Sequence, residues 1–248
     1  MGLFDGKVAI VTGAGQGVGR GIALRLADAG AAVAILERDA ETGARTVGEI
    51  TAHGGSALLV AGDVRERGDC ERVVAAAVET FGGVDVLVNN AQQVPMGPLD
   101  ACTDDDMYTA WESGALAAFR LMQLCHPLMT ERGGGAIVNL ASGAGTEGLP
   151  GLGAYAVAKE GIRALTKVAM REWGVDNVRV NTVCPWARTD YWDGLSEHDQ
   201  QARVRHNPLR RIGEPEEIGA VVVFLVGDAG AYVTGQTIHV DGGNMGFR

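Results

Sequence analysis

Short apolar runs alternate with helix-length segments along almost the whole chain, and this alternation restricts the fold more than any other feature. The runs span residues 7–11, 32–36, 57–60, 84–88, 136–140, 178–183 and 237–240. Because they are largely continuous rather than alternately polar, they predict strands buried on both faces of a parallel sheet. Repeated strand–helix units with right-handed crossovers build a doubly wound fold. The sequence therefore predicts a single α/β domain over residues 1–248, with a seven-stranded parallel sheet and helices on both faces.

Helix start signals agree with this order of elements. Thr103 is followed three residues later by Asp106, and Pro215 precedes two glutamates, as at helix N-termini. In a doubly wound sheet the ligand binds outside the carboxyl ends of the strands. The residues directly after each predicted strand are therefore the candidate site.

Charge and cysteine usage limit the partners and the compartment. The chain has 21 basic and 31 acidic residues and a net charge of −10, which disfavours nucleic acid and anionic membranes as partners. The cysteines lack CxxC spacing, and the N-terminus lacks a charged segment before a long apolar one. We expect a reduced, cytoplasmic protein without a metal site.

A glycine-rich turn, TGAGQGVGRG, follows the first predicted strand. Gly13, Gly17 and Gly19 allow a tight turn, close approach of the backbone to a pyrophosphate, and close packing of helix on strand. A plain helix start is the alternative, which the position after the first strand of an α/β chain disfavours. The turn predicts a dinucleotide site that also includes Gln16 and Val18.

Glu37 ends the second predicted strand, about twenty residues beyond the glycines. Its carboxylate can accept hydrogen bonds from the adenosine ribose and would repel a 2′-phosphate, so NAD is expected and NADP is less favoured. Arg38 offers an opposing interpretation, because a guanidinium can bind a phosphate if Glu37 swings away. A solvated charge pair in a loop is the third interpretation.

Polar residues also follow the third and fourth strands. Asp63 can accept a hydrogen bond from the adenine amino group and Val64 can offer its backbone N–H, although Asp63 also suits a turn or helix cap. The amide of Asn90 can form hydrogen bonds with backbone groups of the loop and can contact the adenosine ribose. An asparagine is also common in loops that bind no ligand, so the residue by itself does not distinguish the two roles.

The candidate catalytic residues follow the fifth strand. Tyr155 and Lys159 are four residues apart and share a helical face, and Ser142 lies thirteen residues before Tyr155. A phenol has a pKa near 10, so a tyrosine that acts as a general acid or base near neutral pH needs a lower pKa. A nearby ammonium group can lower it, because the positive charge stabilises the phenolate. A Tyr and a Lys at helical spacing are ordinary surface residues by themselves. The serine and the glycine turn favour catalysis.

Taken together, these motifs resemble the short-chain dehydrogenase/reductase family, and the match runs from Lys7 to Gly243. The resemblance implies a Rossmann fold and hydride transfer between a nicotinamide and a carbinol or carbonyl carbon. Tyr155 would move the hydroxyl proton, Lys159 would also hold the nicotinamide ribose, and Ser142 would orient the substrate. Family members are usually homodimers or homotetramers. Further cofactor contacts are expected at Pro185 and Thr189.

Three departures from the family pattern lie near the expected nicotinamide. Gln92 replaces a glycine that follows the fourth strand. Gly114 stands where the family carries an asparagine of the catalytic tetrad; we hypothesise that a backbone carbonyl sustains the relay, because glycine tolerates a distorted helix. A missing glycine after Pro185 would place Trp186 against the nicotinamide or substrate, unless Trp186 merely packs under the next loop.

Residues 190–211 form the longest stretch without a strand and are expected to be a mobile helical lid on the substrate side. Val94, Leu149, Tyr191 and Trp192 indicate a mainly apolar substrate. The leading prediction is an NAD-dependent dehydrogenase or reductase of small to medium secondary alcohols or ketones. A 3-oxoacyl-(acyl-carrier-protein) reductase is one alternative, and a nucleotide-binding module with little or no turnover is another.

Overall fold

Seven parallel strands form one sheet in the computed structural model, which describes residues 2–245. The strand order is β3-β2-β1-β4-β5-β6-β7, and every neighbouring pair is parallel. The strands are β1 (Val8–Thr12), β2 (Ala32–Glu37), β3 (Ala57–Ala61), β4 (Val86–Asn89), β5 (Gly135–Leu140), β6 (Val178–Pro185) and β7 (Thr237–Val240). The predicted fold class is confirmed.

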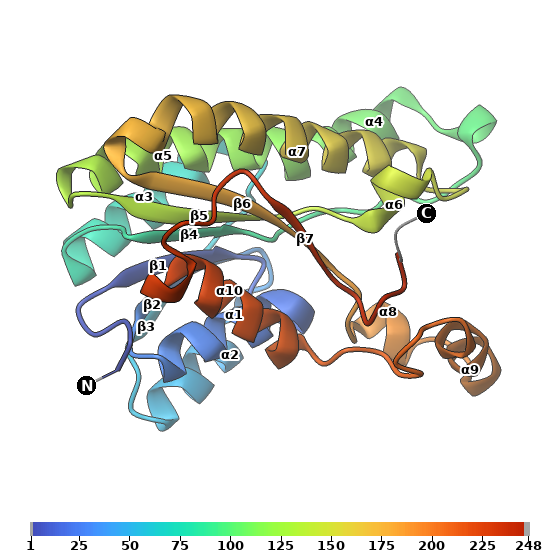
Figure 1. Cartoon of the computed structure of the whole chain (residues 1–248), viewed down its shortest axis with the longest axis horizontal. Coiled ribbons are helices and arrows are strands. Elements are labelled where there is room, and N and C mark those ends of the chain that lie inside the picture. The colour runs from blue at the N-terminus through green and yellow to red at the C-terminus, as the bar shows by residue number, and fades with distance from the viewer. Residues whose placement is uncertain (1, 246–248) are drawn as a thin grey trace.

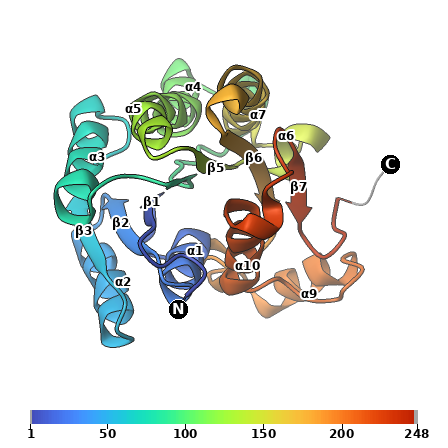
Figure 2. The ribbon, with the colours of Figure 1, turned by 60° about the vertical axis from the view of Figure 1, so that its left-hand side comes forward.

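Helices cover both faces of the sheet (Figures 1 and 2). One face carries α1 (Gly17–Asp28), α2 (Ala40–Ala52) and α10 (Pro215–Val226). The other carries α3 (Arg67–Phe81), α4 (Asp104–Trp111), α5 (Ala117–Glu131) and α7 (Gly153–Trp173). Among residues 2–245, none of these helices is long and apolar enough to cross a membrane.

The core is divided between the two faces, which explains why the strands are continuously apolar. Successive side chains of a strand point to opposite faces. In β1, Ala9 and Val11 pack with Ile22 of α1, whereas Val8 and Ile10 pack in the cluster that contains α3 and α5. Both faces of each central strand therefore need apolar side chains.

The predicted helix starts are present. Thr103 caps α4 by accepting a hydrogen bond from the N–H of Asp106, whose side chain accepts in return from the N–H of Thr103. Pro215 is the first residue of α10. Between α4 and α5 the chain forms one π-helical turn, Glu112–Leu116, which contains Gly114. A glycine there suits the helix distortion expected from the sequence.

Short elements lie around the carboxyl ends of the strands. They are α6 (Gly143–Glu147), α8 (Asp190–Asp193) and α9 (Glu197–Arg205). Three single 3₁₀ turns, Leu99–Ala101, Gly174–Asp176 and Asp228–Gly230, lie in connecting segments. The strand order reverses between β1 and β4, and the loops that follow these two strands leave in opposite directions. A crevice for a ligand is expected at that point.

Candidate active site

A cleft of about 470 Å³ lies at the carboxyl ends of the strands. It brings together twelve residues that the sequence nominated from separate loops: Gly13, Gln16, Gly17, Val18, Glu37, Asp63, Val64, Asn90, Tyr155, Lys159, Pro185 and Thr189. These residues come from the ends of six elements. Their convergence in one cleft is a property of the tertiary structure.

The glycine turn has the backbone that a close approach requires. Gly13 has a φ of +63°, and a Cβ there would lie 2.9 Å from the Cα of Ala91. A Cβ on Gly19 would lie 2.2 Å from the carbonyl oxygen of Gly13. Within the described chain, Gln16 precedes α1 without a side-chain cap, and the first turn of α1 holds no acidic residue. The N–H groups of this turn are thus suited to an anionic ligand.

Asn90 fixes the loop after β4 to the glycine turn. Its Nδ2 donates to the carbonyl oxygens of Thr12 (3.0 Å) and Gly13 (2.9 Å), and its backbone N–H donates to Thr12 Oγ1 at 3.0 Å. Asn89 points the other way, into the core, and donates to Asn139 Oδ1 at 2.8 Å. The asparagine pair therefore ties the fourth strand to the first and fifth.

The Glu37 carboxylate is held by backbone donors. Oε2 accepts from the N–H of Gly15 at 2.9 Å, and Oε1 accepts from the N–H groups of Arg38 (2.8 Å) and Asp39 (3.1 Å). This network fixes a negative charge beside the glycine turn. Swinging the carboxylate away would leave three N–H groups without their partner.

Asp63 is paired with Arg65. Its Oδ2 accepts from Nε (3.0 Å) and Nη2 (2.8 Å) of Arg65, and its Oδ1 accepts from the Arg65 N–H. Burial opposes ionisation, but the hydrogen bonds from Arg65 outweigh it, so the pKa of Asp63 is lowered. Asp63 is thus both a turn residue and a fixed carboxylate in the cleft.

The three candidate catalytic side chains come from the end of β5 and from α7. Ser142 caps α6, where its Oγ accepts from the N–H of Ala144 at 3.1 Å. Tyr155 and Lys159 occupy the first two turns of α7. Lys159 Nζ donates to the carbonyl oxygen of Leu140 at 2.6 Å and lies 5.5 Å from the centre of the Tyr155 ring.

The ionisation of these groups corrects one expectation from the sequence. Burial raises the pKa of Tyr155, and the hydrogen bond with Ser142, which lowers it, does not compensate. Burial also lowers the pKa of Lys159 to about 7. Desolvation therefore dominates at both groups, and the net shift of the Tyr155 pKa is upward.

Gln92 and Gly114, two of the departures noted in the sequence, contact each other. A Cβ on Gly114 would lie 2.2 Å from Oε1 of Gln92. The Nε2 of Gln92 donates to the carbonyl oxygens of Gln93 (2.7 Å) and Ala110 (2.9 Å) and to Ser113 Oγ (3.1 Å). Gln92, Gln93 and Ser113 line the cleft with Tyr155 and Lys159, a role that sequence reasoning did not assign to Ser113 or Gln93.

Trp186 does not line the cleft. It packs edge-on against Trp192, with ring centroids 6.0 Å apart, and borders a smaller hollow with Leu209 and Ile218. The backbone N–H of Trp186 donates to the carbonyl oxygen of Val240. The side chain of Trp186 therefore packs under the following loop, against buried Trp192, and its contact with nicotinamide or substrate stays a prediction.

The expected lid is helical where the structure describes it. Both α8 and α9 fall within residues 190–211, and Ser196 caps α9 through the N–H of Asp199. Tyr191 is 52% exposed, and its hydroxyl accepts a hydrogen bond from Arg203. Movement of this segment stays a prediction.

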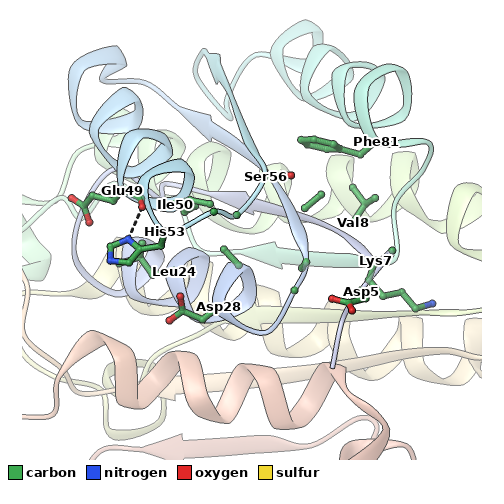
Figure 3. Close-up of a pocket in the computed structure, with 17 residues that line it drawn as sticks. Asp5, Lys7, Val8, Leu24, Asp28, Glu49, Ile50, His53, Ser56 and Phe81 are labelled. Atoms are coloured by element: carbon green, nitrogen blue, oxygen red, sulfur yellow. Dashed lines mark hydrogen bonds between the residues drawn. The ribbon is translucent and has the colours of Figure 1, made fainter. Parts of the chain in front are cut away.

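A second hollow of similar volume lies at the opposite, amino ends of β1, β2 and β3 (Figure 3). Two of its polar side chains have local partners: His53 Nδ1 is 2.8 Å from the carbonyl oxygen of Glu49, and Lys7 pairs with Asp85 at 3.0 Å. None of the sequence-nominated residues borders it. The sequence-predicted residues gather instead in the cleft at the carboxyl ends.

Comparisons with known proteins agree with the fold and the cleft. A family model described as enoyl-(acyl carrier protein) reductase matches residues 13–244. The chain is 40% identical over 260 residues to a 12alpha-hydroxysteroid dehydrogenase of Clostridium sp., and the match covers 100% of both chains. It is 36% identical over 241 residues to a 3-oxoacyl-(acyl-carrier-protein) reductase of Vibrio cholerae, with 97% of this chain and 98% of that protein covered.

Among solved structures, the chain resembles a 7 alpha-hydroxysteroid dehydrogenase complexed with NADH and 7-oxo glycochenodeoxycholic acid. The TM-score is 0.92 and the identity 34%, with 97% of this chain and 94% of that chain covered. The similarity to these relatives, in sequence and in structure, thus extends over nearly the full length of the chain. The chain belongs to the short-chain dehydrogenase/reductase family, whose members are oxidoreductases that use nicotinamide cofactors.

Proposed function

We propose that the protein is an NAD(H)-dependent dehydrogenase that interconverts secondary alcohols and ketones of mainly apolar, cyclic character. The observation that carries the proposal is the position of Tyr155 and Lys159 in the same cleft as the glycine turn. A nicotinamide cofactor held by the turn and an alcohol held at Tyr155 would then meet in one enclosed space. The protein would work as a homodimer or homotetramer in the cytoplasm.

The cleft fits a dinucleotide. Gly13 and Gly17 have positive φ, a Cβ at Gly13 would collide with Ala91, and the start of α1 offers N–H groups to a pyrophosphate. Asp63 and Val64 would hold the adenine, Asn90 and Lys159 the riboses, and Pro185 and Thr189 the nicotinamide end. The cofactor supplies hydride acceptance and donation at its nicotinamide ring.

Glu37 supports the preference for NAD. Its carboxylate is fixed by three N–H donors, so it would meet a 2′-phosphate at close range. Two unit charges at about 4 Å repel by roughly 4 kcal/mol at an effective dielectric near 20. Arg38 is exposed and would recover only part of this cost.

The proton of the alcohol would pass to Tyr155. Ser142 would orient the substrate oxygen through its hydroxyl, and Tyr155 would accept the hydroxyl proton during oxidation and return it during reduction. Burial raises the pKa of Tyr155, so the phenolate needs a positive charge beside it. Lys159 would carry that charge when protonated, close to the carbonyl group of Leu140.

The substrate class is inferred from exposed apolar side chains, of which Val94 lines the cleft, and from the relatives. Val94 is 46% exposed, Leu149 41% and Tyr191 52%, so apolar side chains are available to a substrate. Two of the relatives described above are hydroxysteroid dehydrogenases by name. A cyclic secondary alcohol is the class that we propose.

The acyl-carrier-protein reductase is the second candidate, and the relative from Vibrio cholerae favours it. Such an enzyme must attract an acidic carrier protein, whereas this chain has a net charge of −10. The third candidate, a binding module with little turnover, rests on Gln92 and Gly114. Ser142, Tyr155 and Lys159 are all present and oppose it.

The test is a screen of cyclohexanol and hydroxysteroids with NAD, in which NADH formation is followed for the native chain and for Tyr155→Phe. Tyr108→Phe is the matched control, because Tyr108 is 62% exposed on α4. We expect turnover by the native chain and the control and none by Tyr155→Phe. Equal turnover by all three proteins would refute the role of Tyr155. In a parallel assay with NADH or NADPH, reduction of a 3-oxoacyl thioester without oxidation of any alcohol would favour the second candidate.

A further inference from the structure

The side chain of Gln92 occupies the space that a side chain at position 114 would need. A Cβ on Gly114 would lie 2.2 Å from Oε1, 3.1 Å from Cδ and 3.2 Å from Nε2 of Gln92. The whole amide group therefore sits against the α-carbon of Gly114. Residue 92 belongs to the loop after β4 and residue 114 to the π-turn after α4, so the contact joins two separate segments.

We propose that Gln92 is a positioning residue that acts in place of a side chain at position 114, and that Gln92 and Gly114 form one coupled unit that holds the catalytic wall of the cleft. The proposal rests on the proposed function. One arrangement then accounts for both departures from the family pattern. Gln92 brings an amide group from the loop, and Gly114 leaves the space that this amide group occupies.

The amide has one orientation that satisfies its neighbours. Nε2 lies within hydrogen-bond distance of three acceptors, at 2.7 Å from Gln93 O, 2.9 Å from Ala110 O and 3.1 Å from Ser113 Oγ. A carbonyl oxygen in its place would face two other carbonyl oxygens, so the donor must point this way. Oε1 is consequently directed at Gly114.

Oε1 is buried and has no hydrogen-bond partner among the described residues. It lies where a Cβ of residue 114 would stand, a place at which glycine presents only a hydrogen. A weak Cα–H···O contact suits this geometry. Any larger residue at 114 would have to displace the amide and break its hydrogen bonds, because the amide is held at three points.

Ser113 links the amide to the rest of the wall. Its Oγ donates to the carbonyl oxygen of Thr109 at 2.7 Å and accepts from the backbone N–H of Gln93 at 3.0 Å and from Gln92 Nε2. Ser113 is 2% exposed, so water cannot replace these partners easily. The loop that carries Gln93 and Val94 is therefore fastened to α4 and the π-turn at one buried hydroxyl.

The consequence is a fixed wall opposite the reacting groups. Gln92, Gln93, Val94 and Ser113 line the same cleft as Tyr155. Loss of the amide would free this loop and misplace the substrate relative to Tyr155, and displacements of about 1 Å are enough to reduce turnover strongly. The adenosine half of the cleft, at Glu37 and Asp63, would be unaffected.

The experiment is a double-mutant cycle with Gln92→Gly, Gly114→Asn and the double variant, assayed with NAD and the active alcohol from the screen. Each single variant should lower kcat about tenfold or more, from lost hydrogen bonds or from displacement of the amide. In the double variant the asparagine fills the vacated space, so kcat should return to within about threefold of the native value. Gly48→Asn is the matched control, since Gly48 is an exposed helical glycine and a Cβ added there would meet no heavy atom within 4 Å.

Two readouts separate positioning from mere stability. Gln92→Glu keeps the shape but cannot donate when ionised, so its kcat relative to the native enzyme should rise as pH falls and the carboxyl protonates. The KM for NAD should change less than about twofold in every variant, since the adenosine contacts remain. A purely structural role would lower Tm and leave the kcat of folded enzyme and its pH profile unchanged.

Additive losses in the double variant would overturn the proposal, as would unchanged kcat in both single variants. Failure of this proposal can be distinguished from failure of the proposed function. If the native chain oxidises no alcohol, the proposed function fails, and the coupling between positions 92 and 114 is still read from the Tm values of the same four proteins. If the changes in Tm of the two single variants do not add up in the double variant, the coupling between Gln92 and Gly114 is supported. If they do add up, the coupling is refuted.

Discussion

Lys159 Nζ donates a hydrogen bond of 2.6 Å to the carbonyl oxygen of Leu140, the last residue of β5. This contact fixes the ammonium group of α7 to the carboxyl end of a central strand. Lys159 is 3% exposed and has no carboxylate partner among residues 2–245. The protein therefore holds a nearly buried amine at its site with only a backbone dipole to stabilise its charge.

The first prediction concerns the pH dependence of stability. Burial lowers the pKa of Lys159 to about 7, whereas the unfolded chain keeps a value of 10.5. Between these values the unfolded state binds more protons, so the free energy of unfolding rises with pH from about 7 to 10.5. Thermal unfolding without cofactor should show this rise in the native chain and lose it in Lys159→Met.

Lys167→Met, on the exposed side of the same helix, is the control and should keep the native slope. Parallel Tm curves for the native chain and Lys159→Met over the pH range between the folded and unfolded pKa values would contradict the buried-amine interpretation.

The second prediction concerns Ser142. Removing its hydroxyl in Ser142→Ala takes away a substrate hydrogen bond and a hydrogen-bond partner of the Tyr155 phenol. We expect kcat to fall by roughly 10²-fold or more, with the NADH dissociation constant unchanged. The lost cap of α6 should cost about 1 kcal/mol in the free energy of unfolding. Steady-state kinetics and NADH fluorescence separate the two effects, with Ser56→Ala at the far end of the sheet as control.

The third prediction concerns cofactor choice. Glu37→Gln removes the negative charge but keeps an oxygen for the N–H of Gly15. The ratio of NADPH to NADH dissociation constants should then fall by about tenfold or more, because the charge repulsion is removed. Titration of both cofactors by fluorescence measures the ratio. A native chain that binds NADPH more tightly than NADH would show that Glu37 does not select the cofactor.

The fourth prediction concerns a buried carboxylate outside the site. Asp85 is 4% exposed and accepts from Lys7 Nζ (3.0 Å), Arg132 Nε (3.0 Å) and the N–H of Val8 (2.9 Å). Burial opposes ionisation, but these donors outweigh it and lower the pKa of Asp85. Asp85→Asn should reduce the free energy of unfolding by about 3 kcal/mol at neutral pH, because two cations lose their partner.

Since the folded pKa of Asp85 lies below its unfolded value of 3.8, the stabilisation is present above that unfolded value and is lost as pH falls through the folded pKa. Denaturant unfolding at several pH values should therefore show the native chain and Asp85→Asn converging in strong acid. A constant difference between the two proteins into strong acid would argue against this linkage.

The sequence by itself determined the strands, the helix starts and the chemical types at the site. Strands buried on both faces need mainly apolar residues, so continuous apolar runs such as 32–36 and 57–60 identified strands without coordinates. The glycine turn and the spacing of Tyr155 and Lys159 depend on local backbone geometry, which is also encoded locally. Glu37 and Asn90 could be nominated because each lies at the carboxyl end of a strand.

Only the tertiary structure decided which side chains meet. The contact between Gln92 and Gly114 joins residues 22 positions apart through the packing of a loop on a π-turn, and neither residue indicates the other in the sequence. The orientation of Trp186 toward Trp192 and the pKa changes at Tyr155 and Lys159 likewise depend on burial. Desolvation and side-chain packing depend on all the elements that surround a residue, including elements distant in the sequence. They are therefore known only from the tertiary structure.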